Sequence, residues 1–383
     1  MDIPLINKTL DWFFRILERF AKIKYWAPLS AILIAALCWG YFYPKYKSLK
    51  SFTKPGSDTL SPDRRVMKIQ INNPLTVLPD FGESQEKSHP GKMQYRLAMP
   101  VIGHIFSLNF AQLLYFQNLV GILFFLIIIL LVYRSTHDKV AALLLALALA
   151  FSYTGSSFYI DGTPFYDGIA YFCLASAMIF KNPILVFLSV FVACWTDERA
   201  VIASSLIVVW WQVNKKGVSP SFKDLFSLST QSIAIIAAWI IYFAGRYILT
   251  TRFGFYVQSK GMFSPEVITA HKFHIFWGLF AGFRWLWLVI FLGFAWLIKD
   301  KNYPLATALL FLTLILTATS GIVYDHLRSV AYMFPLIIIF LYIWGTTNEK
   351  RINLRYLLLG IMALCFLMSP LKYMLGLSSF MGQ

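Results

Sequence analysis

Long apolar stretches separated by short polar connections run along most of the chain. About 20 apolar residues cross the hydrocarbon core of a bilayer as a helix. The first such stretch covers residues 25–42 and precedes a long polar connection that ends near residue 110. Ten more stretches follow, at residues 113–133, 140–153, 167–180, 183–195, 200–213, 228–249, 275–298, 304–323, 329–344 and 356–375. The pattern predicts an all-α polytopic membrane protein with about 11 transmembrane helices, in a single transmembrane domain over residues 26–375.

Two further segments have apolar residues at helical spacing but are too polar or too short to span a bilayer. Residues 1–25 interleave Trp12, Ile16 and Phe20 with arginines and lysines, and they are too charged for a signal peptide. They predict a cytoplasmic amphipathic helix on the inner membrane surface. Residues 97–108 lie within the external loop over residues 45–110. They predict an interfacial helix on the outer leaflet.

The composition fits this interpretation. Hydrophobic residues make up 58% of the chain and charged residues 14%, against about 45–50% and 25% in soluble domains. A soluble enzyme is thereby excluded. The four cysteines lie inside apolar stretches without the spacing of a disulfide framework or a zinc site, so we interpret them as packing residues.

The formal charge of +16 reflects topology, because lysines and arginines concentrate in connections on the cytoplasmic side of membrane proteins. Sixteen fall on the side of the amino terminus: Lys8, Arg15, Arg19, Lys22, Lys24, Arg134, Lys139, Lys181, Lys215, Lys216, Lys223, Lys299, Lys301, Lys350, Arg351 and Arg355. Five lie in the opposite short connections: Arg199, Arg252, Lys260, Lys272 and Arg328. The amino terminus is therefore expected inside and, after an odd number of spans, the carboxyl terminus outside. Nucleic acid is not an expected partner.

The hairpin over residues 181–215 is too short to cross the whole membrane twice. Each of its helices has at most about 16 residues, or about 24 Å at 1.5 Å per residue, against a core of about 30 Å. Its turn holds Asp197, Glu198 and Arg199. Ionised groups at such depth face a water-filled cavity or each other. We therefore predict a polar cavity recessed into the outer leaflet and open to the outside.

Most acidic residues fall on the outer side in this topology, which indicates that function resides there. Candidate residues lie in four connections: Asp80 and Arg96; Asp161 and Asp167; Asp197, Glu198 and Arg199; and Asp325, His326 and Arg328. Paired acids beside an arginine suit general-base chemistry, and arginine suits phosphate. Plainer interpretations stay open: a solvated loop for Asp80 and Arg96, a self-neutralising turn at Asp197, and a helix-end anchor for Arg328. Tyr153, Phe158, Tyr159 and Tyr166 suit a membrane-interface belt or a sugar-binding surface.

Several of these segments resemble the glycosyltransferase C (GT-C) superfamily of polytopic membrane enzymes. Residues 94–106, QYRLAMPVIGHIF, are similar to a stretch common in its bacterial members. DGTPFYDGIAYF and TDERAV resemble later acidic connections of the group. The usual acidic signature after the first span is displaced here, with Asp80 almost forty residues beyond Phe42.

The resemblance implies transfer of a sugar from a polyprenyl-phosphate donor to a glycan, lipid or protein acceptor, with inversion. The enzyme would lie in the bacterial cytoplasmic (inner) membrane, with its active site facing outside, and would serve cell-envelope polysaccharide biosynthesis. Asp80, or failing it Asp197 or Glu198, would be the base. Arg199 and Arg328, helped by Arg96 and His326, would hold the phosphate. A divalent metal could bind between the acids, but no ligand spacing supports one, and no cofactor is predicted.

Three alternatives remain: a surface-polysaccharide polymerase, an acyltransferase using His104 or His326, and a secondary transporter. A transporter would keep its ionisable residues near the bilayer midplane in matching halves of the chain. The acids here gather toward one face, and no internal repeat is visible. No nucleotide-binding loop occurs in the sequence, which argues against an ATP-driven pump.

Overall fold

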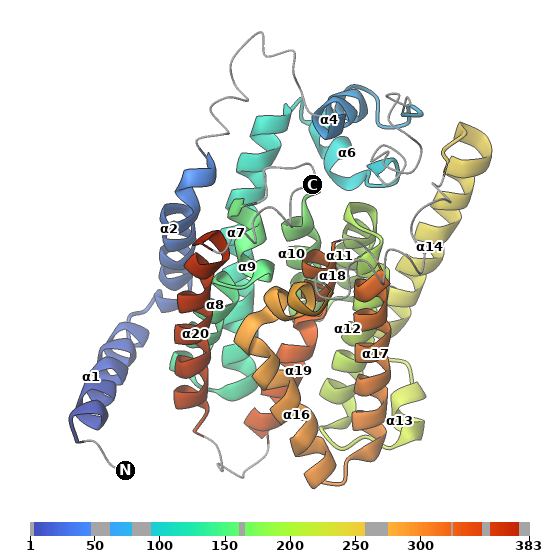
Figure 1. Ribbon diagram of the computed structural model, residues 1–383. Coiled ribbons are helices and arrows are strands. Elements are labelled where there is room, and N and C mark those ends of the chain that lie inside the picture. Colours follow the sequence, from blue (N-terminus) through green and yellow to red (C-terminus); the bar gives the residue numbers. More distant parts are fainter. Residues whose placement is uncertain are drawn as a thin grey trace.

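The computed structural model describes residues 4–46, 62–78, 93–160, 165–256, 275–322, 325–346 and 353–374. These residues form helices and turns, with no strand among them. Figure 1 shows the helices running up and down between two ends of one bundle. Their bounds are α1 Pro4–Ala21, α2 Trp26–Tyr46, α4 Pro62–Asn72, α6 Ala98–Ile105, α7 Phe110–Thr136, α8 Lys139–Ala150, α9 Tyr153–Ile160, α10 Asp167–Ile179, α11 Pro183–Thr196, α12 Arg199–Lys216, α13 Phe222–Phe226, α14 Thr230–Phe253, η1 Arg284–Leu286, α16 Trp287–Lys299, α17 Tyr303–Ile322, α18 His326–Ala331, α19 Phe334–Thr346 and α20 Leu354–Met374.

Five helical stretches are long and apolar enough to cross a membrane: Phe110–Thr136, Thr230–Phe253, Ile275–Lys299, Tyr303–Ile322 and His326–Thr346. Two bent pairs, α1 with α2 and α8 with α9, raise the number to seven. Three shorter apolar helices accompany them, at Asp167–Ile179, Pro183–Thr196 and Leu354–Met368. The chain is thus an all-helical protein with the apolar spans of a membrane protein. The larger number of 11 spans stays a prediction.

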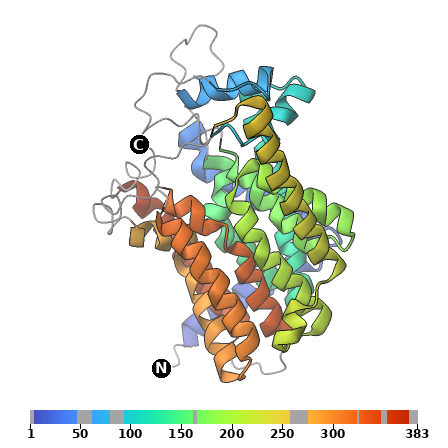
Figure 2. The same cartoon turned by 90° about the vertical axis from the view of Figure 1, so that its right-hand side faces the viewer.

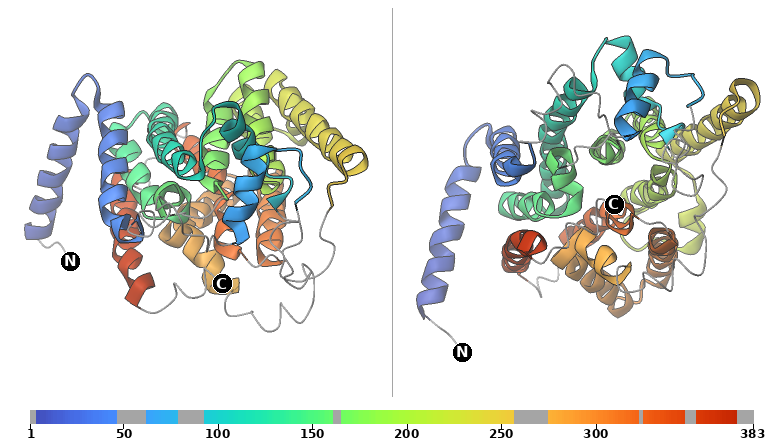
Figure 3. Two further views of the ribbon diagram at one scale, coloured as in Figure 1. Left: turned by 90° about the horizontal axis from the view of Figure 1, so that it is seen from above. Right: turned by 45° about the horizontal axis from the view of Figure 1, so that its top comes forward.

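The helices differ in how deeply they lie in the bundle. The apolar window of the His326–Thr346 stretch is 89% buried, whereas that of α14 is only 22% buried. α19 therefore forms the centre of the bundle, and α14 packs at its edge with one side free for lipid (Figures 1 and 3). Gly293 and Gly345 bring α16 and α7 close to α19, because a Cβ at either position would lie about 2 Å from Phe340 or from the Ser135 carbonyl oxygen.

Polar residues fix where several of these apolar helices begin. Asn109 and Gln112 form a capping box at the start of α7. Asp138 accepts hydrogen bonds from two backbone N–H groups at the start of α8, and Asn182 caps α11 just before Pro183. Such caps supply partners for N–H groups that the helix itself leaves unpaired. The polar connections between the predicted spans thus contain helix starts as well as topology signals.

One end of the bundle is covered by α4 and α6, which lie across it above α10, α11 and α12 (Figures 1 and 2). α7 has 27 residues and α14 has 24, but α11 has only 14. At 1.5 Å per residue these lengths correspond to about 40, 36 and 21 Å. The turn after α11 therefore lies below the upper ends of α7 and α14, as Figure 1 shows. A helix, α6, is present within the predicted segment 97–108, and its interfacial position stays a prediction.

The connection between the predicted stretches 140–153 and 167–180 is helical in its first half. Tyr153–Ile160 form α9, which continues α8 after a bend of 57°. Gly155 permits this bend, because a Cβ there would lie 2.5 Å from the Leu149 carbonyl oxygen. Tyr153, Phe158, Tyr159 and Tyr166 are buried. They are packing residues in the bundle rather than members of a surface belt.

At the opposite end, α1 packs beside the beginnings of α8 and α20. The Arg355 guanidinium of α20 donates to Glu18 of α1 and to Asp138, each at 2.6 Å. Lys139 donates to the Ala21 carbonyl oxygen at 2.8 Å. Trp12 on α1 stays exposed. α1 is thus a helix joined to the bundle by charged contacts, and its position on the inner membrane surface stays a prediction.

Candidate functional site

Asp167 is the first residue of α10 and the most heavily bonded acid in the bundle. Its side chain has no exposed surface, although ionised groups are costly to bury unless paired. Arg328 of α18 donates to it from both Nε and Nη2. The hydroxyls of Tyr153 and Tyr332 donate at 3.2 and 3.3 Å. The contacts with Arg328 and Tyr332 join residues that are more than 160 positions apart in the chain.

Asp197 forms a second buried centre in the turn between α11 and α12. It is also fully buried, and Arg199 binds both of its oxygens, with Nε at 2.7 Å and Nη2 at 2.6 Å. Burial alone would raise the pKa of Asp197, but the charges of Arg199 and Arg96 outweigh burial and hold the pKa well below its usual range. Asp197 is therefore a carboxylate at neutral pH.

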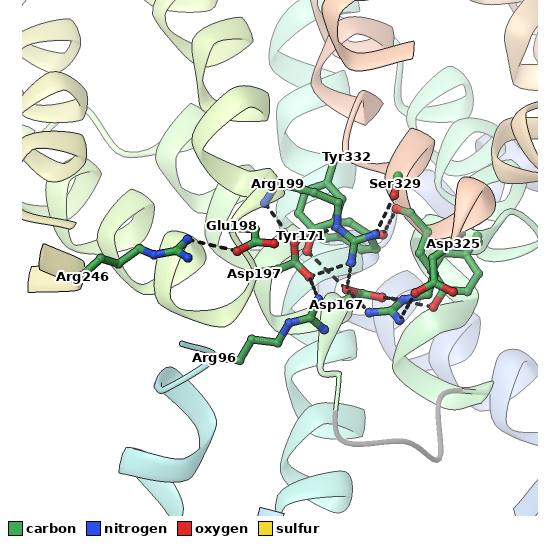
Figure 4. A network of polar contacts seen from close by, with 12 residues as sticks. Arg96, Asp167, Tyr171, Asp197, Glu198, Arg199, Arg246, Asp325, Ser329 and Tyr332 are labelled. Carbon is green, nitrogen blue, oxygen red and sulfur yellow. Dashed lines mark hydrogen bonds and ion pairs between the residues drawn. The ribbon is translucent and has the colours of Figure 1, made fainter. Parts of the chain in front are cut away.

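Arg199 links the two centres. Its Nη1 donates to the Ser329 hydroxyl at 2.7 Å, and its Nη2 lies 3.5 Å from Asp167. Ser329 follows Arg328 on α18, so one arginine of α12 spans the space between α10 and α18. Figure 4 shows Asp167, Asp197, Arg199 and Ser329 close together between these helices. We call Arg96, Asp167, Asp197, Arg199 and Arg328 the outer ion network.

Arg96 enters the outer ion network from the covering end, two residues before α6. Its Nη2 lies 2.9 Å from Asp197, and Figure 4 shows it reaching Asp197 from the side of α6. Its Nε and Nη1 are buried and have no hydrogen-bond partner among the described residues. The Phe165 ring lies 5.3 Å from the Arg96 guanidinium and 3.8 Å from that of Arg328. Arg96 thus retains two unpaired donors beside a buried acid.

Glu198 lies at the edge of the outer ion network and, unlike its neighbour Asp197, is partly exposed. Its side chain is 46% exposed and pairs with Arg246 of α14 at 3.0 Å. Arg246 also lies over the Tyr95 ring at 4.2 Å, and the Tyr95 hydroxyl is 2.6 Å from that of Thr250. These contacts fasten the segment that contains Arg96 to α14.

The structure brings together most of the residues that the sequence singles out. Arg96, Asp167, Asp197, Glu198, Arg199, Asp325 and Arg328 lie in or beside the network. Asp325 is 53% exposed and binds Arg328 at 2.9 Å. The His326 ring instead contacts the Ser320 carbonyl oxygen at 2.7 Å. Asp80 and Asp161 lie outside the described residues.

The site differs from the open cavity predicted from the sequence. The buried charges are recessed, but they pair with each other, and the two central carboxylates have no exposed surface. Of the two environments that suit buried charges, the described residues adopt mutual pairing. Within the same residues, no three His, Cys, Asp or Glu side chains gather where they could hold a metal ion.

Several contributors were missed by the sequence reasoning. Arg246 lies within an apolar stretch, and a lone arginine there is itself a signal of function or of a buried pair. Tyr171 donates to the Arg328 carbonyl oxygen at 3.0 Å, and Tyr332 binds Asp167. Nothing in their local sequence distinguishes these tyrosines from the many other aromatic residues of the chain.

The outer ion network contains one arginine with unpaired donors, Arg96, and two carboxylates that are paired with arginines. Two partly exposed acids, Glu198 and Asp325, lie beside it. Arginine donors suit phosphate or carboxylate oxygens, and partly exposed carboxylates can accept protons. No family model, curated protein or solved structure matches this chain. The resemblance to glycosyltransferases therefore stays a prediction.

Proposed function

We propose that the protein is a membrane glycosyltransferase that moves a sugar from a polyprenyl-phosphate donor to an acceptor on the outer face of the membrane. The supporting observation is Arg96, whose Nε and Nη1 are buried without hydrogen-bond partners beside Asp197. A buried unpaired donor destabilises a protein unless something binds it. A phosphate group supplies the oxygens that these donors need.

The proposal extends to the topology. The three shorter apolar helices and α12 would add four spans to the seven described above, giving 11 spans with the amino terminus inside. Ile105 and Phe106, at the end of α6, are about two-thirds exposed, which suits a helix resting in the outer leaflet. The lipid chain of the donor would lie along such a surface while its phosphate reaches Arg96.

The reaction has a simple balance. The acceptor hydroxyl oxygen bonds to the anomeric carbon, and the bond from that carbon to the phosphate oxygen breaks. The bonding electrons leave with the polyprenyl phosphate, and the hydroxyl proton passes to a carboxylate. Asp80 is kept as the first candidate for that base. Of the other two candidates, Glu198 suits the role better than Asp197, because the Glu198 side chain is 46% exposed, whereas Asp197 has no exposed surface and is bound by two arginines.

Asp197 suits a positioning role instead. It holds Arg96 and Arg199 in place, and two arginines on one carboxylate leave it little tendency to accept a proton. Arg328 is engaged through Nε, Nη1 and Nη2. The phosphate would therefore bind first to Arg96, with Arg199 and Arg328 supporting its charge.

Binding of polyprenyl phosphate to the protein in lipid nanodiscs tests the proposal. A charge-assisted hydrogen bond contributes about 1.5–3 kcal/mol, so Arg96→Gln should weaken binding about 10- to 150-fold. Arg252→Gln is the matched control, because Arg252 is exposed at the outer end of α14. Polyprenol, which lacks the phosphate, should bind wild type far more weakly.

Two results would contradict the proposal. One is equal binding of polyprenol and polyprenyl phosphate by wild type, and the other is normal phosphate binding by Arg96→Gln. Among the alternatives, the acyltransferase gains nothing from the histidines. His104 is exposed with its Nδ1 2.9 Å from the Ile71 carbonyl oxygen, and His326 contacts Ser320. Transport of an ion without any lipid-phosphate binding would favour the transporter.

A further inference from the structure

Two glutamines beside Arg96 have buried polar atoms without partners. Gln94 has no exposed surface, and in the part of the chain that the structure describes neither its Oε1 nor its Nε2 has a hydrogen-bond partner. Gln70 of α4 is 1% exposed, and its Oε1 is likewise unpaired. The Gln70 Nε2 donates to the carbonyl oxygens of Met93 and Gln94, at 3.2 and 3.4 Å. The unpaired groups thus come from a single turn and from the helix packed against it.

This concentration is unusual for a folded protein. Nearly all buried polar atoms have a partner, and each exception needs an explanation. With Nε and Nη1 of Arg96, five unpaired polar atoms belong to three residues of this region. The turn itself is well formed, because the Arg96 N–H donates to the Met93 carbonyl oxygen at 2.9 Å. The unpaired atoms therefore belong to an ordered turn rather than to a poorly formed one.

The mixture of donors and acceptors restricts what that ligand can be. Arg96 and the Gln94 Nε2 need acceptors, which a phosphate supplies. The Oε1 atoms of Gln94 and Gln70 need donors, and an ionised phosphate has none. A hydroxyl group is both donor and acceptor. The ligand that satisfies all three residues therefore has hydroxyl groups next to its phosphate.

We infer that Gln70 and Gln94 bind hydroxyl groups of the sugar, beside the phosphate held by Arg96. This inference rests on the proposed function, and it adds a site that selects the glycosylated donor over free polyprenyl phosphate. The Phe165 ring lies next to Arg96 and packs against the cluster that contains Met93. It supplies an apolar surface of the kind that the flat faces of sugars contact.

The test measures binding to the protein in nanodiscs. It compares polyprenyl phosphate with a panel in which the same lipid phosphate carries glucose, mannose, galactose, N-acetylglucosamine or arabinose. Wild type should bind at least one member of the panel about tenfold more tightly than polyprenyl phosphate. Gln94→Leu should remove most of that gain, because a site built for hydroxyl groups loses affinity when its partners are missing. Its affinity for polyprenyl phosphate should stay within about twofold of wild type.

Thermal unfolding without ligand is the second measurement. Gln94→Leu replaces unpaired buried atoms by an apolar group of similar size, so the melting temperature should stay the same or rise. Gln212→Leu is the control: Gln212 is also fully buried with an unpaired Oε1, but its Nε2 binds the Ser232 hydroxyl at 3.2 Å, far from Arg96 in the chain. Its variant should bind both ligands as wild type does.

Failure of the proposed function and failure of the further inference give different results in these experiments. If wild type does not bind polyprenyl phosphate, the proposed function fails and the inference fails with it. If polyprenyl phosphate binds but no sugar of the panel adds affinity, only the inference is overturned. It is also overturned if Gln94→Leu weakens both ligands equally and melts at a lower temperature, which would make Gln94 structural. Unchanged affinity of Gln94→Leu for both ligands would overturn it too, whatever the melting temperature, because Gln94 would then not contact the sugar.

Discussion

Replacing Asp197 by asparagine tests whether the outer ion network holds the fold together. The amide side chain of Asp197→Asn would keep one oxygen but would replace the oxygen bound by Arg96 and Arg199 with a nitrogen that donates. Those contacts are 2.9 and 2.6 Å long in the native protein. Two largely buried guanidinium groups would then lack their shared counter-ion. Loss of one partner of a buried ion pair costs about 3–5 kcal/mol, and we expect the free energy of unfolding to fall by that amount.

Glu198→Gln is the matched control, because it removes a neighbouring carboxylate of the same turn by the same kind of change. Glu198 is 46% exposed, and solvent-exposed ion pairs contribute about 0.2–1 kcal/mol. The assay is reversible unfolding in mixed micelles, followed by circular dichroism. Two outcomes would refute the reasoning: equal effects of the two substitutions, or an effect of Asp197→Asn below about 1 kcal/mol. Either would mean that the buried arginines lose no stabilisation when residue 197 is neutral.

The difference between wild type and Asp197→Asn should also depend on pH in a defined direction. The pKa of Asp197 is lowered in the folded protein, against about 3.9 in the unfolded chain. The stabilisation is then fully present above about pH 4 and is lost as the pH falls through the folded value. The difference should therefore be the same at about pH 8 and about pH 5 and should shrink only in stronger acid.

Two further predictions concern packing and orientation. Gly345→Ala should destabilise the protein by about 1–3 kcal/mol, because the new Cβ would lie 1.9 Å from the Ser135 carbonyl oxygen. Gly360→Ala is the control: a Cβ at Gly360 would have nothing within 4 Å, so this substitution should be neutral or stabilising in the same unfolding assay. Cysteine at Ser107, exposed beside α6, should react with an impermeant thiol reagent from outside, and cysteine at Ser219, exposed near α13, only from inside. The native cysteines are all buried and should not interfere, and reversed labelling would overturn the orientation.

The apolar pattern was enough to locate most helices. The predicted stretch 183–195 is α11, and 200–213 lies within α12, because long apolar runs bounded by charges leave few other structures in lipid. The apolar pattern did not predict a separate helix at residues 153–160. Gly155 lets two helices meet at a bend there, and neighbouring helices bury the polar groups.

The sequence predicted most of the residues of the candidate site but not how they pair with one another. The predicted topology placed these acids and arginines on one side of the membrane, and the short helices predicted a recessed turn. Which acid pairs with which arginine depends on contacts over more than 100 residues, such as Asp167 with Arg328. No local pattern encodes such a contact. For the same reason the contribution of Arg246, inside an apolar helix, became clear only from its contacts with Glu198 and Tyr95.

The order in which the network residues are synthesised has a consequence for biogenesis. Asp167, Asp197 and Arg199 enter the membrane with the middle helices, whereas Arg328 follows more than 120 residues later. Until then Asp167 lacks its principal counter-ion. Arg328 lies 161 positions after Asp167, so at about 5–20 residues per second the interval lasts roughly 8–32 seconds. During this time the half-made bundle carries an acid that lipid tolerates poorly. Chains that stop before α18 would therefore be recognisable to membrane quality control as incomplete, and completion of α18 would be the step that releases a chain from it.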